Sequence, residues 1–243
     1  MTSRAGIRLF VQAPLTAGVS LIMEDQHVHY LRNVLRQSEG DHIELFNGRD
    51  GQWRARIAVL DRRGGSFMVE RQTLEQTSED GPWLLVAAVK RARLEMIVEK
   101  ATELGAARIC PVTTVRTNSE RLNRDRLVSI ATEAAEQCAR LTVPEIGAMT
   151  PLKNMLMDWP TDRRLYLLDE TGAGVAIAQA FTAHPKELGA ALLIGPEGGF
   201  DQSELDAMRI LPFVKALDLG KRILRAETAA LAALACYQAI AGN

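Results

Sequence analysis

The chain has 243 residues, of which 47% are hydrophobic and 24% are charged, and its formal net charge is −1. This composition is that of an ordinary soluble protein with enough apolar residues for a core, and the overall charge gives no sign of nucleic-acid binding. The longest apolar stretches, such as Trp83–Val89 and Ala229–Tyr237, are too short to cross a bilayer and the N-terminus lacks the apolar segment of a secretion signal, so we expect a cytoplasmic protein.

The cysteines and histidines form no pattern typical of a metal site. The three cysteines lie far apart with no CxxC pair, and the four histidines stand near no other candidate ligands; they are Cys110, Cys138, Cys236, His27, His29, His42 and His184. We expect reduced thiols and no structural metal.

The first seventy-five residues have the pattern of short strands joined by tight turns. Strands are predicted at Ile43–Phe46, Trp53–Ile57 and Ser66–Glu70, and Asn47–Gly51 between the first two is a hairpin turn. One helix is predicted at Gln26–Arg36, where apolar residues recur at helical spacing. Close strands of this kind indicate a small barrel.

A polar segment that ends in Gly-Pro, Glu75–Pro82, separates this part from the rest of the chain. The sequence therefore predicts a first domain at residues 1–73, a linker at 74–82 and a second domain at 83–243. Across Val86–Arg126 nine basic residues stand against five acidic ones, a local excess that favours contact with an RNA backbone as much as it favours a solvated helix face.

In the second domain strands alternate with helices, which predicts an α/β sheet of parallel character. The expected strands are Trp83–Val89, Ile109–Val112, Arg164–Leu168, Ala190–Ile194 and Val214–Leu219, with amphipathic helices at 94–104 and 127–138 and further helices after the last two strands. Ligands bind beyond the C-terminal ends of such strands. That rule selects the loops after Leu168, Ile194 and Leu219.

The loop Gly195–Phe200 leads from a strand into a helix whose start is well specified. Asp201 is placed to cap the helix, Glu204 completes a capping box, and Phe200 with Leu205 forms a hydrophobic staple. The glycines allow the backbone to approach a ligand closely, although a purely structural turn explains them equally well. The loop matches neither a dinucleotide fingerprint nor a P-loop.

The segment Leu219–Ala229 runs from a strand end into the last helix. Glu227 and Thr228 are adequately explained as capping residues at the start of that helix. Arg225, between Leu224 and Ala226, has no such explanation, which favours a functional role.

The two segments Leu192–Phe200 and Leu219–Ala229 together resemble the signature of the RsmE family, small-subunit rRNA uridine-N3 methyltransferases of the SPOUT class. Three further blocks, His29–Arg36, Lys100–Gly105 and Glu133–Arg140, also resemble family blocks. The resemblance covers essentially the whole chain. Departures from the pattern occur at Lys90–Arg93, where the positive ends are kept, and in the loosely matching loop after Leu168.

The resemblance implies a PUA-like β-barrel that holds RNA, followed by a SPOUT domain with a mostly parallel sheet and a C-terminal trefoil knot. It further implies a homodimer in which each pocket, completed at the subunit interface, binds S-adenosylmethionine. Carried over to this sequence, the cofactor-binding residues are Leu168, Ile194, Gly195, Glu197, Gly198, Leu219, Gly220, Ile223, Leu224, Arg225 and Thr228.

The implied reaction is methylation of N3 of a uridine in the decoding region of 16S rRNA, with the assembled small ribosomal subunit as the expected partner. Arg225 is the candidate for stabilising the uracil anion, and either Glu197 or Glu227 would take the N3 proton. Candidate RNA contacts are Arg8, Arg32, Arg36, Lys90, Arg91, Arg93, Arg116 and Arg140.

Two alternatives stay open at this point. One is a SPOUT methyltransferase that acts on tRNA or large-subunit rRNA, including at a ribose hydroxyl. The other is a non-catalytic RNA-binding factor in ribosome assembly, against which the intact GPEGG and LRAET segments argue.

Overall fold

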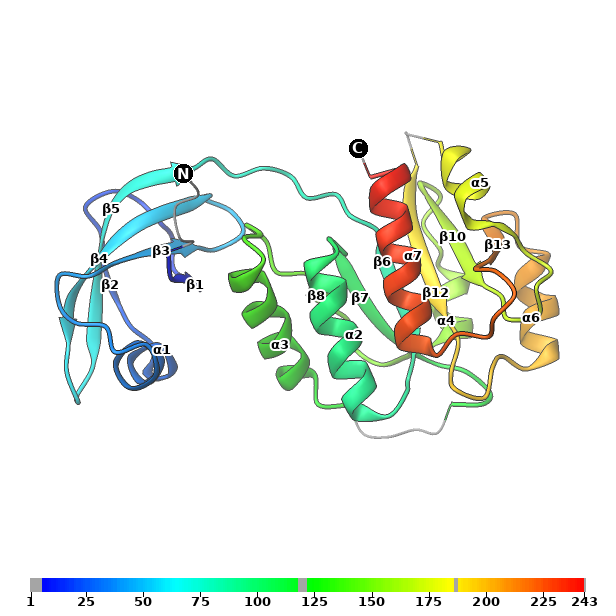
Figure 1. Cartoon of the computed structure of the whole chain (residues 1–243), viewed down its shortest axis with the longest axis horizontal. Coiled ribbons are helices and arrows are strands. Elements are labelled where there is room, and N and C mark those ends of the chain that lie inside the picture. Colours follow the sequence, from blue (N-terminus) through cyan, green and yellow to red (C-terminus); the bar gives the residue numbers. More distant parts are fainter. Residues whose placement is uncertain (1–5, 118–121, 186–187, 243) are drawn as a thin grey trace. The chain divides into compact units, whose positions relative to one another are not determined.

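The computed structural model describes residues 6–117, 122–185 and 188–242 (Figure 1). These residues group into two compact units, and residues 135–143 belong with the N-terminal unit although they follow it by more than fifty positions in the chain. The remaining residues from Glu79 onward form the second unit. No helix of the described ranges is long and apolar enough to cross a membrane.

The N-terminal unit is built on a five-stranded sheet in the order β1-β3-β4-β5-β2. Its elements are β1 (Arg8–Phe10), β2 (Ser20–Ile22), α1 (Asp25–His29), a π-helical segment η1 (Tyr30–Val34), β3 (His42–Phe46), β4 (Gln52–Leu60) and β5 (Gly65–Leu74). β1 pairs parallel with β3, and the other pairs are antiparallel. The three strands predicted from alternation are therefore present, each longer than expected.

Inward-facing apolar side chains of this sheet form the core of the unit. Ile43 and Leu45 on β3, Ile57 on β4 and Phe67 on β5 are at most 1% exposed, and Leu31 of η1 is fully buried against them. Among the described residues β1 and β2 are the two edges of the sheet, so backbone hydrogen bonds do not close it into a complete barrel.

The helix expected at 26–36 is present but is wound irregularly. After one α-helical turn, Leu35 N donates to Tyr30 O and Gln37 N donates to Leu31 O, which are longer steps than those of an α-helix. Arg36 then adopts a left-handed conformation with φ of 55°. The segment therefore ends where predicted, with an arginine in a conformation that glycine usually takes.

Arg8 is the main polar anchor of the N-terminal unit. Its guanidinium donates to the carbonyl oxygens of Ala135 and Arg140 at 2.9 and 2.6 Å and to Gln52 Oε1 at 2.8 Å, and it lies 4.4 Å from the ring centre of Phe46. Only 9% of the residue is exposed. The expectation that Arg8 contacts RNA is therefore wrong, because its donors are already used inside the unit.

Arg140 is buried in the same region, with 8% of its surface exposed and Nη2 donating to the Thr142 hydroxyl at 3.1 Å. Phe10, Phe46, Ala135, Leu141 and Val143 form a small apolar cluster there. Arg140 is thus a buried structural residue at the end of this segment and not the phosphate contact that was expected.

We expect Arg8→Met to lower the free energy of unfolding by about 3 kcal/mol or more, because the carbonyl oxygens of Ala135 and Arg140 would lose charged donors while remaining buried. Urea denaturation of the full chain measures this change. Arg49→Met is the matched control, since Arg49 Nη2 donates to one exposed carbonyl, that of Gln12. Equal losses in the two variants would contradict the anchoring role.

The second unit contains an eight-stranded sheet in the order β11-β13-β10-β12-β6-β7-β8, with β9 paired to β7. Its strands are β6 (Trp83–Ala87), β7 (Arg108–Thr113), β8 (Glu145–Ile146), β9 (Thr150–Pro151), β10 (Arg163–Leu168), β11 (Val175–Ala176), β12 (Gly189–Ile194) and β13 (Val214–Asp218). Each recorded pairing in this sheet is parallel, as the alternation of strands and helices predicted.

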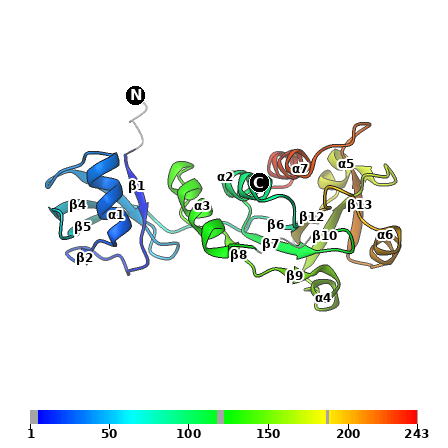
Figure 2. The ribbon, with the colours of Figure 1, turned by 90° about the horizontal axis from the view of Figure 1, so that it is seen from below.

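Helices cover both faces of this sheet, with α2, α5 and α7 on one face and α4 and α6 on the other (Figure 2). The helices are α2 (Arg91–Glu103), α3 (Arg124–Gln137), α4 (Leu152–Met157), α5 (Ile177–Thr182), α6 (Gln202–Arg209) and α7 (Ala226–Ile240). Because both faces are covered, the central strands are apolar at successive positions, and Leu84 and Leu85 are both fully buried.

The long elements of this unit lie where they were predicted, and α2 ends before Gly105, whose φ is +80°. The two-residue strands and the short helices α4 and α5 were not predicted.

The cysteines are free, and burial raises the pKa of the Cys110 thiol to about 11, so this thiol is protonated at neutral pH. The trefoil knot stays a prediction.

Candidate functional site

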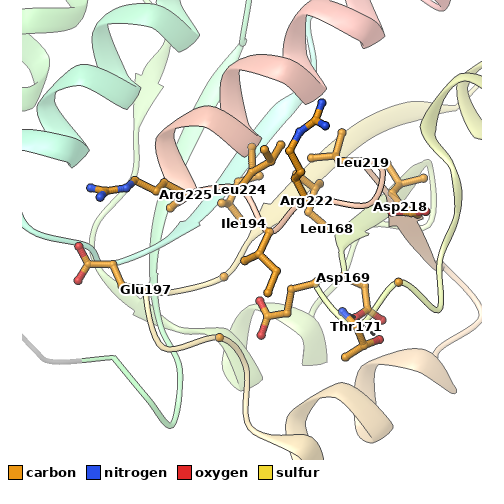
Figure 3. A pocket seen from close by; sticks show the side chains of 18 of the residues that line it. Leu168, Asp169, Thr171, Ile194, Glu197, Asp218, Leu219, Arg222, Leu224 and Arg225 are labelled. Atoms are coloured by element: carbon orange, nitrogen blue, oxygen red, sulfur yellow. Dashed lines mark hydrogen bonds between the residues drawn. The ribbon is translucent and has the colours of Figure 1, made fainter.

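A cavity of about 820 Å³ opens where β10, β12 and β13 end (Figure 3). These three strands are neighbours in the sheet, in the order β13-β10-β12, and run parallel. Their C-terminal ends therefore lie along one edge, and the cavity is lined by the three loops that follow Leu168, Ile194 and Asp218. The strand-end rule thus selected three loops that meet at one cavity.

The loop from β12 to α6 forms one wall. Asp201 accepts from Ser203 N at 3.0 Å while Glu204 Oε2 accepts from Asp201 N at 3.1 Å, which completes the predicted capping box. Phe200 is 3% exposed and packs in the same apolar cluster as Leu205. This well-fixed helix start holds the preceding glycine turn in place.

Two glycines of that turn differ in whether the structure has room for a side chain at their position. Gly199 has φ of +69°, and a Cβ there would lie 1.9 Å from Glu170 Oε1. At Gly198, where φ is not in the left-handed range, a Cβ would meet no atom within 4 Å. Gly199 is therefore required by the fold of the loop, whereas Gly198 leaves open space beside the cavity.

We expect Gly199→Ala to lower the free energy of unfolding by about 1–3 kcal/mol, because the alanine would adopt a strained φ and displace the Glu170 carboxylate. Gly198→Ala should change it by less than about 0.5 kcal/mol. Thermal unfolding of both variants, in the absence of ligands, makes the comparison. A loss in Gly198→Ala as large as in Gly199→Ala would contradict this assignment.

The loop from β10 to β11 is fixed by a buried acid. The side chain of Asp169 is fully buried, and its Oδ2 accepts from Arg209 Nε and Nη2 at 3.1 and 2.5 Å while Oδ1 accepts from Thr171 N at 2.9 Å. Burial by itself raises the pKa of Asp169. The hydrogen bonds from Thr171 and Arg209 together lower that pKa by more than burial raises it, so the net pKa lies below the ordinary value. Asp169 stays ionised and pins the loop to α6.

Glu170, the next residue, lines the cavity and was not predicted. Burial raises its pKa, the neighbouring Asp169 charge raises it further, and the backbone hydrogen bond from Phe200 offsets this in part. A signal for Glu170 was present in the sequence, because two acids, Asp169 and Glu170, come directly after a buried strand. From that loop the prediction took Leu168 alone.

The third loop, from Leu219 to Arg225, leads into α7 without a side-chain cap. Arg225 is the residue that precedes the helix, and its carbonyl accepts from Ala229 N at 2.8 Å. The interpretation of Glu227 and Thr228 as capping residues is therefore wrong, since the structure records no side-chain hydrogen bond at this helix start. Glu227 has a different partner.

That partner is Arg93, in the first turn of α2. Arg93 Nη1 contacts Glu197 Oε1, and Arg93 Nε lies 3.7 Å from Glu227 Oε1. Arg93 also lines the cavity. The structure thus joins an arginine that was expected to contact RNA with both glutamates that were expected to take a proton.

The remaining predicted site residues fall into clear groups. Thr228 is the one expected cofactor-binding residue that does not line the cavity, and it is exposed on the first turn of α7. The expected residues that line the cavity are Leu168, Ile194, Gly195, Glu197, Gly198, Leu219, Gly220, Ile223, Leu224 and Arg225. Figure 3 shows Glu197 and Arg225 together at one side of the cavity and Asp169, Thr171 and Asp218 at the other. The Arg225 side chain is exposed and points away from Leu224.

The expected RNA contacts are dispersed. Arg36, Lys90 and Arg91 are exposed and Arg32 is half-buried. Arg116 is exposed, donates to Gly198 O at 3.3 Å and pairs with Asp201 at 3.2 Å, so it lies beside the cavity loop. No three metal-ligating side chains gather within the described ranges.

Two family models match the chain: an RNA methyltransferase domain at residues 80–238 and an RNA methyltransferase PUA domain at residues 24–66. A protein of Rickettsia conorii named ribosomal RNA small subunit methyltransferase E is 31% identical over 94% of this chain and 93% of its own length. The chain belongs to this methyltransferase family. A Synechocystis protein of the same name is also 31% identical, over 96% of this chain and 77% of its own length.

Solved structures of similar proteins agree with this assignment. A Legionella pneumophila methyltransferase in complex with bound SAM superposes with a TM-score of 0.85 at 28% identity, covering 96% of this chain and 97% of that one. The ribosomal RNA small subunit methyltransferase E of Neisseria gonorrhoeae, bound to S-adenosyl methionine, gives 0.84 at 26% identity, with the same coverage. The family and fold class predicted from the motifs are therefore confirmed, the knot apart.

Proposed function

We propose that this chain uses S-adenosylmethionine to methylate N3 of a uridine in the decoding region of 16S rRNA. The observation that carries the proposal is the cavity itself, because the two motifs that resemble the RsmE signature form two of its three walls. Its volume of about 820 Å³ is that of a site for a ligand the size of a nucleoside. Relatives with a matching fold have been solved with this methyl donor bound.

The lining of the cavity fits the donor. Leu168, Ile194 and Leu224 provide apolar contacts, and the backbone of the three loops provides hydrogen-bonding groups that the sheet does not use. Open space beside Gly198 leaves room for close approach to the main chain. When bound, S-adenosylmethionine supplies a methyl group attached to a positively charged sulfur.

Arg225 and Glu197 are the chain's contribution to the chemistry. Uracil N3 carries a proton at neutral pH, so that proton must leave before N3 can act as a nucleophile. Arg225 is an exposed cation at the cavity with its guanidinium available to a uracil carbonyl oxygen, where it would stabilise the developing anion. Glu197 lies on the same side of the cavity, and in this proposal it would hold the proton.

RNA binding would fall to the exposed cations Arg36, Lys90, Arg91 and Arg116, with the half-buried Arg32. A homodimer is supported by the rim of the cavity, where Ile223 is 85% exposed and would be covered by a second copy. We place the reaction in the cytoplasm, on the assembled small subunit.

Mass mapping of 16S rRNA tests the function. We expect cells that lack the gene to lose one 3-methyluridine in the small subunit, and the wild-type gene to restore it. A missing methyl group in tRNA, in large-subunit rRNA or on a ribose would replace this proposal by a different RNA target. Unchanged modification of all three RNAs would favour the non-catalytic assembly factor.

Arg225→Ala tests the role of the arginine. We expect the single-turnover rate of the purified protein to fall by about 10²–10³-fold, with the dissociation constant of the donor changed by less than about threefold, because the lost interaction forms only as the anion develops. Rapid-quench kinetics and calorimetry measure the two quantities. Equal losses in rate and in donor affinity would make Arg225 a merely structural residue.

Glu170 predicts a pH dependence of donor binding. Its raised pKa means that the carboxylate in the cavity becomes neutral at a higher pH than an ordinary glutamate. Since the ionised form attracts a cation, the affinity for the positively charged donor should fall as the pH is lowered from 7 towards 5, and the affinity for the demethylated product, whose sulfur carries no charge, should fall less.

In Glu170→Gln we expect weaker donor binding at pH 7 and no difference between donor and product in the pH slope. Glu103→Gln, which removes an exposed acid of α2 that pairs with Lys100, is the control and should keep the wild-type slope. A donor affinity independent of pH in the wild-type protein would remove Glu170 from the site.

A further inference from the structure

Arg93 links the two glutamates that are candidates for taking the uracil proton, and the exposed fraction of the side chain increases from one glutamate through Arg93 to the other. Glu227 in the first turn of α7 has 16% of its side chain exposed, Arg93 28% and Glu197 36%. Glu197 lines the cavity and Glu227 does not. The three charges therefore form a row that runs from the interior of the unit to the cavity.

The inner end of this row is not placed to react with a substrate. Glu227 Oε1 faces Arg93 Nε, and its Oε2 is buried with no hydrogen-bond partner recorded among the described residues. A carboxylate with one oxygen enclosed and the other facing a cation is a counter-ion for that cation. Glu227 therefore fixes the position of Arg93.

The outer end of the row is placed to react. Glu197 Oε1 is held by Arg93 Nη1, and the side chain reaches the cavity on the side where Arg225 lies (Figure 3). The loop that carries Glu197 includes Gly198 and Gly199, so its side chain needs an external partner to hold one orientation. Arg93, which is anchored on a different element, α2, supplies that partner.

We infer that Arg93 is a positioning residue that holds Glu197 toward the uracil, and that Glu227 acts only through Arg93. This inference rests on the proposed function. The N3 proton moves to Glu197 Oε2, the oxygen that Arg93 does not hold, and then to water, because Glu197 is exposed. N3 keeps the electron pair of its N–H bond and forms the bond to the methyl carbon as the carbon–sulfur bond breaks, with that bond's electron pair remaining on sulfur.

This assignment replaces the expected role of Arg93 as a phosphate contact. Its guanidinium already faces two carboxylates, and a phosphate would have to displace them. Lys90 and Arg91, at the same end of α2, are exposed. Arg91 forms an ion pair with Glu95, a residue of the same helix. They remain the RNA candidates of this segment.

The test uses the full-length protein and compares Arg93→Gln, Arg93→Lys, Glu227→Gln and the double variant Arg93→Gln/Glu227→Gln. At saturating RNA and donor, we expect Arg93→Gln to lower the single-turnover rate by about 30–100-fold and Arg93→Lys to recover at least about a third of the wild-type rate. Donor affinity by calorimetry should stay within about twofold in both. Lys100→Gln, which removes a paired cation from the same helix, is the control and should keep the wild-type rate.

The double variant decides how Glu227 acts. Glu227→Gln should lower the rate by about tenfold in the wild-type background and have no further effect in Arg93→Gln, because its only route to the reaction would already be lost. Glu227→Gln acting equally in both backgrounds would overturn the inference. So would an Arg93→Gln protein with a normal rate at saturating RNA and a shallower salt dependence of RNA binding, which is the behaviour of a phosphate contact.

Failure of the proposed function looks different. In that case the wild-type protein itself would give no heat with S-adenosylmethionine and transfer no methyl group to 16S rRNA, and both proposals would fall together. Thermal unfolding of each variant separates a lost contact from a lost fold. Should Arg93→Gln not fold, the comparison of Arg93→Lys with Glu227→Gln still decides, since the inference requires both to fold and Glu227→Gln to slow the reaction more than Arg93→Lys does, with donor binding unchanged in both.

Discussion

The site depends on one constraint, the adjacency of three parallel strands. β13, β10 and β12 are neighbours, and parallel pairing places their C-terminal ends along one edge. Parallel neighbours cannot be joined by hairpins, so the chain leaves each strand through an irregular loop before it returns. Three such loops at one edge bring together backbone groups that belong to no ladder. A cavity lined by main chain follows from that arrangement, and side chains then refine it.

The refinement is largely electrostatic. Arg209 holds the loop after β10 through the buried Asp169, and Arg93 joins the loop after β12 to α7. Arg8 performs a similar task in the N-terminal unit with carbonyl oxygens in place of carboxylates. A guanidinium suits these positions because its several donors have fixed directions and can satisfy more than one acceptor. The exposed cations that remain are the ones available to RNA.

Local signals account for what could be predicted from the sequence. The start of α6 was predictable because Asp201 and Glu204 lie three residues apart and interact with each other's backbone. The cavity loops were predictable because each follows a buried apolar run. Strands of two residues, such as Glu145–Ile146, contain too few positions to show alternation and were missed.

Interactions between distant residues account for most of what could not be predicted. Asp169 and Arg209 are forty positions apart, and neither residue alone indicates a buried ion pair. Arg8, Arg93 and Arg140 were assigned to RNA because arginine suits phosphate. The same side chain suits carbonyl and carboxylate oxygens equally well, and only burial distinguishes the cases. Thr228 was carried over from a motif, which records residue identity without recording which way a side chain points.

Because residues 135–143 belong to the N-terminal unit, that unit cannot be separated from the rest of the protein by a single cut in the gene. The apolar cluster around Phe46 includes Ala135 and Leu141, which come from the last turn of α3 and the segment after it. A gene fragment that stops at Ser78 would encode the strands of that unit without part of its interior. The N-terminal unit is therefore not a module that one recombination event can excise, and a fusion or truncation that is meant to preserve it must keep the chain intact through Val143.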